Sequence, residues 1–230
     1  MFEFRPENPF PLLAHDAYTL EQAQSHAREV DAWLGLVTEP IESELLARSQ
    51  ARGREQDVEK WIGLPVQTLL TPYLEIRSML DALAPQDGST VVDLGAGYGR
   101  MAWVIGAHYP AVRFVGYELV AERVQESLRC LARSSYSNVQ MIEADLSAPE
   151  FQLPEADSYF MYDFGSRSAI DQVLRKLQNI ATRRPIAVIG RGRSSRDAIE
   201  RSHPWLSQVV FPFHTRNFSI YRSGYGISSS

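Results

Sequence analysis

The fold of this chain is decided by residues 90–100, which read TVVDLGAGYGR. A short apolar run ends in Asp93, and glycine then occupies every second position, at Gly95, Gly97 and Gly99. The residues that follow, 101–107, are predicted to form a helix. Because glycine permits a positive φ and leaves the backbone open to a ligand, a strand that ends in glycines and continues as a helix is typical of a ligand-binding turn.

The spacing of the glycines argues against two common nucleotide-binding turns. A dinucleotide fingerprint reads G-x-G-x-x-G, and counted from Gly95 its third glycine would fall on Arg100. A phosphate-binding P-loop needs Gly-Lys-Ser/Thr, which this turn lacks. An ordinary tight turn is the plainer alternative, and three alternating glycines behind an acid make it the weaker one.

The pattern D-x-G-x-G-x-G resembles motif I of the class I S-adenosylmethionine-dependent methyltransferases. In that family the acidic residue holds the amino end of the cofactor, and the glycine turn passes beneath its methionine part. The resemblance implies that this chain binds S-adenosylmethionine through Asp93, Gly95, Ala96, Gly97 and Gly99.

Two further apolar runs end in acids. Residues 112–117 lead into Glu118, roughly 20 residues after the glycine turn, where a βαβ unit places an acid that accepts hydrogen bonds from ribose hydroxyls. Residues 139–145 end in Asp145, and in the resembling family this position lies beside the adenine amino group. These two strand ends add four predicted cofactor-binding residues, Glu118, Leu119, Asp145 and Leu146.

A fourth run, residues 158–163, ends where the reacting methyl group lies in the resembling family. Tyr162 and Asp163 are therefore the catalytic candidates. Asp163 would hold an amine or take its proton, and Tyr162 would form a wall of the methyl site. The alternative is that Tyr162 packs in the core and Asp163 caps the following loop. The segment reads YDFG, which departs from the Asn/Asp-Pro-Pro-Tyr signature of base and glutamine methyltransferases, so base methylation is disfavoured.

Two other stretches carry weaker signals. Residues 71–75, TPYLE, loosely resemble a region of the non-SET lysine methyltransferases related to disruptor of telomeric silencing. That resemblance implies that Tyr73 lies over the methionine end of the cofactor, and the alternative is that Tyr73 is a core contact. Residues 191–196, RGRSSR, form a basic patch that either grips an anionic group of the acceptor or is a solvated loop.

Composition limits the function classes. The chain has 230 residues, 44% of them hydrophobic, and a net charge of −5, which argues against a constitutive nucleic-acid binder. The five histidines and the single Cys130 show no metal-ligand spacing, so no metal site is expected and Cys130 is predicted to be buried. Neither a secretory signal nor an apolar run of roughly 20 residues is visible, so we expect a cytoplasmic protein without membrane contact.

The chain divides into three predicted parts. Residues 1–84 should form a helical extension or lid, 85–222 the methyltransferase core, and 223–230 a flexible tail. In the extension, a capping box at Thr19 opens a helix whose apolar face includes Trp33 and Val37 and which Pro40 ends. Helices are then predicted at residues 41–51 and 72–83, and the polar stretch 52–57 between them is expected to be mobile.

From residue 91 onward, strands alternate with helices. This order predicts an α/β fold with a doubly wound, mostly parallel sheet, which an antiparallel C-terminal hairpin at residues 209–221 closes. The residues therefore favour a methyltransferase that acts on an unidentified acceptor, with a leaning to an amine nitrogen of a protein or small molecule rather than a nucleic acid. A non-catalytic scaffold that binds S-adenosylmethionine is the alternative, and a nicotinamide-dependent oxidoreductase is a distant third because of Arg100 and the hairpin.

Overall fold

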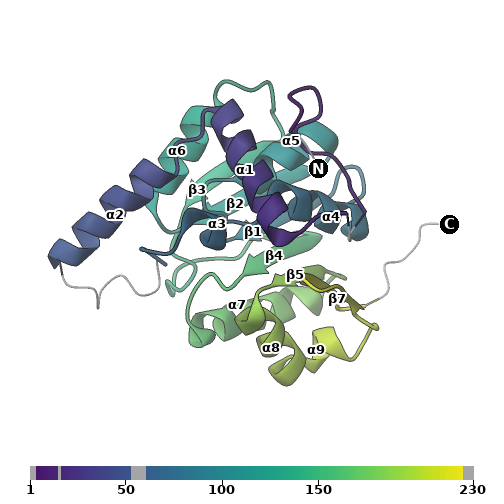
Figure 1. The fold of residues 1–230 in the computed structure, drawn as a ribbon. Helices are drawn as coiled ribbons and strands as arrows, with labels where there is room; N and C mark the ends of the chain where they lie inside the picture. Colours follow the sequence, from purple (N-terminus) through teal and green to yellow (C-terminus); the bar gives the residue numbers. More distant parts are fainter. Residues whose placement is uncertain (1–3, 15–16, 53–60, 225–230) are drawn as a thin grey trace.

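The computed structural model describes residues 4–14, 17–52 and 61–224. In this part of the chain, one seven-stranded sheet lies between two layers of helices (Figure 1). The strand order is β3-β2-β1-β4-β5-β7-β6, and only the pairs that involve β7 are antiparallel. The strands are β1 (Thr90–Leu94), β2 (Arg113–Glu118), β3 (Val139–Glu143), β4 (Ser158–Tyr162), β5 (Ala187–Arg191), β6 (Phe213–His214) and β7 (Phe218–Arg222). The predicted fold class is confirmed.

The sheet separates two hydrophobic cores because successive side chains of a strand point to opposite faces. Val91 of β1 belongs to the core beneath α1, α4, α5 and α6, whereas its neighbour Val92 belongs to the core beneath α7, α8 and α9. The helices are α1 (Leu20–Leu34), α2 (Glu39–Arg52), α3 (Val66–Leu69), α4 (Tyr73–Leu83), α5 (Arg100–His108), α6 (Ala121–Leu131), α7 (Arg167–Ala181), α8 (Arg193–Ser202) and α9 (Pro204–Ser207).

The strand order reverses between β1 and β4: β2 and β3 lie on one side of β1, and β4 and the later strands lie on its other side. After β1 it continues into α5 on one face, and after β4 it continues into α7 on the other face (Figure 1). Loops that leave adjacent strands toward opposite faces open a crevice at the carboxyl ends, and ligands of open α/β sheets bind there. The glycine turn and residues 162–165 lie on the two sides of this point.

The N-terminal extension begins as predicted and then differs. Thr19 and Gln22 form the capping box of α1, but the helix ends at Gly35, whose φ is +66°, and not at Pro40. Pro40 is instead the second residue of α2, where its missing N–H costs nothing. The early end leaves Val37 outside the helix and 43% exposed.

The other member of the predicted apolar face, Trp33, is 49% exposed. Its ring centroid lies 6.1 Å from that of Phe4, so it packs against the N-terminal arm rather than in the core. Cys130 is buried, as predicted.

Several other boundaries differ from the prediction. The short helices α3 and α9 were not predicted, and α8 begins at Arg193, so residues 191–196 are no loop. The strand β6 contains two residues, and 209–211 pair with no strand of the described sheet. Except for Arg52, the segment predicted to be mobile lies outside the described residues, as do residues 225–230 of the predicted tail.

Two negative findings hold for the described residues. No helix there is long and apolar enough to cross a membrane. Likewise, residues 4–14, 17–52 and 61–224 contain no group of three or more histidine, cysteine, aspartate or glutamate side chains that could hold a metal ion.

Candidate cofactor and methyl-transfer site

One pocket opens at the carboxyl ends of the parallel strands, where the crevice is expected. It measures roughly 1060 Å³ with its open mouth included. Strand ends and the loops after them supply one side, and the N-terminal extension supplies the other. The strand-end residues that line it are Gly95, Gly97, Tyr117, Glu118, Leu119, Asp145, Leu146, Ser147, Tyr162, Asp163, Phe164 and Gly165. The extension contributes Trp61, Leu64, Thr68, Leu69 and Leu70.

The glycine turn forms the floor of this pocket. The Tyr117 carbonyl at the end of β2 accepts hydrogen bonds from the N–H groups of Gly95 and Ala96, at 2.9 and 2.8 Å. Gly97 has a φ of +54°, and a Cβ placed there would lie 2.8 Å from Cδ2 of Leu70. The backbone conformation therefore favours glycine at this position, and any other residue would also displace the end of the Leu70 side chain.

The third glycine of the motif has a different task. A Cβ at Gly99 would collide with Oγ of Ser127 on α6 and lie 3.1 Å from Sδ of Met141 on β3. Gly99 therefore lets the start of α5 pack closely on its neighbours, and it does not line the pocket.

Asp93 lies beneath the turn, where it is 4% exposed. Its Oδ1 has no hydrogen-bond partner, although a buried carboxyl oxygen normally has one. Burial, together with the negative charge of Glu118, raises the pKa of Asp93 well above the usual range of a carboxyl group. Asp93 adjoins a smaller cavity beneath Leu70 and Thr71, so a cationic group that enters there would meet an unpaired acceptor.

Glu118 turns back toward the glycine turn. Its Oε2 accepts a hydrogen bond from the Gly97 N–H at 2.8 Å, and its Oε1 accepts one from the Val120 N–H at 3.0 Å. Oε1 also lies 3.4 Å from Nη1 of Arg123, a buried residue of α6 that the sequence analysis missed. The predicted acid and the predicted turn are thus joined directly.

Asp145 and Leu146 line the pocket beyond Glu118, as does Leu119. Oδ1 of Asp145 accepts hydrogen bonds from the Ser147 hydroxyl at 2.6 Å and from its N–H at 2.8 Å. The hydroxyl contact is the main cause that lowers the pKa of Asp145. An ionised carboxylate between two leucines fits a flat apolar base that carries an amino group.

At the end of β4, two elements distant in sequence hold Tyr162. Its hydroxyl donates to the Thr68 carbonyl of α3 at 3.0 Å, and the Arg191 guanidinium lies 4.2 Å from the centre of its ring. Arg191 is in turn paired with the buried carboxylate of Glu75 on α4 at 2.9 Å. Tyr162 is therefore a fixed wall of the pocket.

Asp163 caps α8 and lines the pocket at the same time. Its carboxylate accepts hydrogen bonds from the N–H groups of Ser195 at 2.7 Å and Ser194 at 3.3 Å. Its φ is +37°, which is uncommon for any residue except glycine. A Cβ at Gly192 would collide with the same carboxylate, so the turn before α8 leaves room for it.

Tyr73 does not come to the pocket. It is fully buried, its hydroxyl donates to Oδ1 of Asp31 on α1 at 2.8 Å, and its ring lies 5.1 Å from the Arg100 guanidinium. Neither the pocket nor the smaller cavity beside Asp93 has Tyr73 in its lining. The core-contact interpretation of this residue describes its position.

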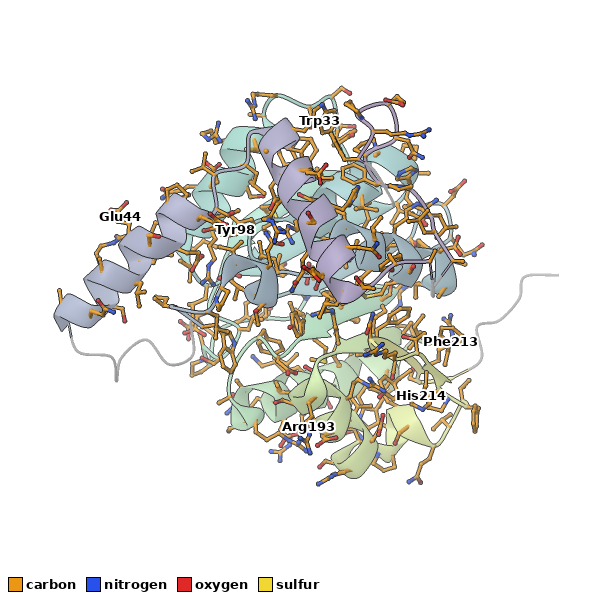
Figure 2. The ribbon with its side chains drawn as sticks, in the orientation of Figure 1. Trp33, Glu44, Tyr98, Arg193, Phe213 and His214 are labelled. Carbon is orange, nitrogen blue, oxygen red and sulfur yellow. The ribbon has the colours of Figure 1, made fainter. Side chains whose placement is uncertain are left out.

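The predicted basic patch is dispersed. Arg191 is held by Glu75, the Arg193 side chain is 92% exposed, and Arg196 donates to the Arg216 carbonyl. Figure 2 shows Arg193 at the periphery, whereas Tyr98 of the glycine turn lies in the interior. No basic residue of the patch lines the pocket in the described part of the chain.

Sequence reasoning missed several pocket residues, chiefly Arg123, Leu70, Phe164 and Trp61. One signal was available for Arg123. It lies in the first turn of the helix after Glu118, where the helix dipole favours an acid and disfavours a cation. Arginine at such a position indicates a specific negative partner.

Comparisons with known proteins agree with the geometry. The model of the O-methyltransferase domain family matches residues 67–185, slightly more than half of the chain. A Salinibacter ruber RNA methyltransferase, solved with S-adenosyl-L-homocysteine, is 19% identical with a TM-score of 0.50, and the match covers 70% of this chain and 97% of that one. TrmN from Thermus thermophilus is 16% identical with a TM-score of 0.48, over 67% of this chain and 48% of that one.

A third similar structure is a putative sarcosine dimethylglycine methyltransferase from Galdieria sulphuraria. It is 16% identical with a TM-score of 0.42, over 55% of this chain and 51% of that one. No curated protein matches the sequence.

The sheet order and the glycine turn define a class I methyltransferase fold. Because the family model covers more than half of its length, the chain belongs to the O-methyltransferase domain family and is an S-adenosylmethionine-dependent methyltransferase. The residues present fit this cofactor in two respects. Asp93 offers an unpaired buried acceptor, and side chains at Gly95 and Gly97 would fill the turn.

Proposed function

We propose that this methyltransferase acts on an amine nitrogen of a small molecule or protein, and that Asp163 holds the acceptor against the wall formed by Tyr162. The observation that carries this proposal is the position of Asp163. Its positive φ and its hydrogen bonds to α8 hold the carboxylate in place at a residue that lines the pocket. Strained residues at a pocket edge point to function when the surrounding contacts maintain them.

Within the proposal, the chain's own residues orient the cofactor. Asp93 would take the amino end, Glu118 the ribose hydroxyls, and Asp145 with Leu119 and Leu146 the adenine. When bound, S-adenosylmethionine supplies a sulfonium methyl group, which an acceptor nitrogen takes with its lone pair while sulfur keeps the electrons of the broken bond. In-line displacement depends mainly on positioning and on exclusion of water.

Two features of the pocket favour nitrogen over oxygen. A hydroxyl acceptor needs a base to remove its proton, and the described lining residues contain no histidine or lysine. Asp163 already accepts two backbone hydrogen bonds, so it suits an electrostatic anchor better than a base. A neutral amine brings its own lone pair, and its protonated form is attracted to the carboxylate and the aromatic rings of the mouth.

A hydroxyl oxygen is the second candidate, because the matching family is described as an O-methyltransferase domain. An assay with methyl-tritiated S-adenosylmethionine separates the two. It would offer pairs of primary amines and alcohols with the same carbon skeleton, a lysine-containing peptide, and transfer RNA. We expect label in amines only. Transfer to alcohols but not amines would overturn the nitrogen proposal.

A further inference from the structure

Two buried side chains, Arg123 and Glu42, connect the N-terminal extension to Glu118, the acid proposed to hold the ribose. Arg123 of α6 donates from Nε and Nη2 to both carboxylate oxygens of Glu42, at 2.8 and 3.1 Å. Glu42 belongs to the first turn of α2 and also accepts the Tyr98 hydroxyl at 2.9 Å. The side chains of Arg123, Glu42 and Glu118 are 3%, 6% and 7% exposed. None of these contacts is therefore weakened much by solvent.

The two acids do not share Arg123 equally. Glu42 receives a two-pronged pair, the strongest arrangement that a guanidinium makes with a carboxylate. Glu118 receives a single contact of 3.4 Å. Because the planar guanidinium presents its donors in a fixed fork, the bond to Glu42 determines how closely Arg123 can approach Glu118.

The occupancy of Glu118 gives this difference a consequence. A carboxylate has about four acceptor positions, and the N–H groups of Gly97 and Val120 fill two of them well. If Arg123 were released from Glu42, its nearest anion would be Glu118, whose remaining positions it would occupy. The ribose hydroxyls would then have to displace a charge-assisted bond.

We infer that Glu42 is a positioning residue for cofactor binding: it holds Arg123 back from Glu118 and so keeps the ribose-binding positions of that carboxylate available. The inference rests on the proposed role of Glu118. Most of α2 projects from the body of the molecule in Figure 1, and Glu42 lies in its first turn. The inference therefore assigns a function to the start of this helix.

The test measures ribose recognition separately from overall binding. Titration calorimetry gives the Kd of S-adenosylhomocysteine and of its analogue without the 2′ and 3′ hydroxyls. The ratio of the analogue's Kd to the Kd of S-adenosylhomocysteine reports how much the hydroxyls contribute to affinity. We expect Glu42→Gln, which keeps the shape and removes the charge, to lower this ratio about tenfold. In the Glu118→Gln background, Glu42→Gln should lower it no further.

Asp31→Asn is the matched control. Asp31 is also a buried carboxylate of the extension, and it pairs with Arg100, but it makes no contact with Glu118. A general loss of packing would move both variants alike, so an unchanged ratio in Glu42→Gln, or an equal fall in Asp31→Asn, would overturn the inference. An unchanged ratio in Glu118→Gln would instead reject the proposed ribose role.

If Glu42→Gln does not give a folded circular dichroism spectrum, Arg123→Lys provides the same test. Lysine keeps the charge but cannot pair with two oxygens of Glu42 and face Glu118 at once. The ratio should again fall several-fold, whereas a ratio equal to that of the wild-type protein would contradict the inference.

Discussion

The ends of β1, β2 and β3 line one half of the pocket, the end of β4 lines the other half, and different parts of the chain hold them. In the first half, which we assign to the cofactor, the bond between Gly97 and Glu118 joins residues 21 positions apart. In the second half, assigned to the acceptor, Tyr162 and Thr68 are 94 positions apart, and Arg191 and Glu75 are 116 apart. The bond that joins the strand ends of the first half lies between neighbouring βα units, whereas the extension bonds directly to the wall of the second half.

Because the two halves are held differently, we expect them to respond differently to substitution. Contacts within one βα unit form together with the sheet, so substitutions there should remove cofactor binding outright. The acceptor half depends on where the extension and α8 dock, so substitutions there should alter acceptor turnover and leave cofactor affinity almost unchanged.

The largest effect is expected for Gly97→Val. Valine would be forced to a φ of +54° with its Cβ 2.8 Å from Leu70, and S-adenosylhomocysteine affinity should fall at least about a hundredfold. Gly88→Val is the control, because Gly88 has a φ of +79° with nothing within 4 Å of the added Cβ. Calorimetry on both variants tests the assignment. Equal affinity in Gly97→Val and Gly88→Val would show that the turn does not bind the cofactor.

Asp163→Asn should act on the other half alone. Asparagine still caps a helix well but carries no charge, so the loss of one charge-assisted contact should lower kcat/KM for an amine by about tenfold to a hundredfold. The Kd of S-adenosylhomocysteine should stay within about twofold of the wild-type value. Asp197→Asn, on α8 but outside the pocket, is the control. Similar losses in both variants would assign the effect to α8 stability.

The cofactor half was largely predictable because its information is local. The order of Asp93, Gly95, Gly97 and Glu118 along the chain follows from strand, turn and helix units of regular length. The alternation of strands and helices likewise fixed the sheet, and the capping box at Thr19 fixed the start of α1. Each of these signals depends only on residues close in sequence.

Tyr162 and Asp163 were predicted from the end of a strand, but the contacts that the extension and the β4–α7 loop make with the pocket were not predictable, for the opposite reason. Leu70 and Phe164 lie against the glycine turn only because the extension and the β4–α7 loop fold over it. The motif around Tyr73 could not reveal that its hydroxyl bonds Asp31 in the core. That residues 193–196 begin α8 instead of forming a loop was not visible, because the carboxylate that caps this helix belongs to Asp163, directly after β4.

A pH dependence should distinguish Asp93 within the cofactor half. At pH values below its raised pKa, Asp93 holds a proton in the free protein, and a bound ammonium group would expel it. Affinity should therefore rise by at most about tenfold per pH unit, up to the pH at which Asp93 ionises in the free protein. Calorimetry in buffers of different ionisation enthalpy measures the released proton. Asp93→Asn should abolish the release. Asp145→Asn should retain it, since the pKa of Asp145 is lowered.

The same shift has a defined sign for stability. Folding raises the pKa of Asp93, so its contribution to the free energy of unfolding is complete below the unfolded pKa of 3.8 and is lost as the pH rises through the folded value. Asp93→Asn should therefore stabilise the free protein at high pH. If the wild-type protein released no proton on binding, the proposed contact between Asp93 and the amino end of the cofactor would be wrong.

The weakest effect should come from a single hydrogen bond between the extension and the acceptor half. Tyr162→Phe removes the hydroxyl that donates to the Thr68 carbonyl but keeps the ring against Arg191. One neutral hydrogen bond is worth about 1 kcal/mol, so stability should fall by that amount or less. Because the bond fixes one pocket wall to the other, KM for the amine should rise about threefold, with cofactor affinity unchanged.

Tyr109→Phe gives the matched control, since the Tyr109 hydroxyl, at the end of α5 and outside the pocket, accepts one hydrogen bond of 2.6 Å from Arg77 of α4. It should lose at least as much stability in a denaturant titration, because the lost bond is to a charged group, and keep the wild-type KM. If Tyr162→Phe changes stability alone, as Tyr109→Phe should, the extension covers the acceptor half without shaping it. If it weakens S-adenosylhomocysteine instead, the division of the pocket into two independently held halves is wrong.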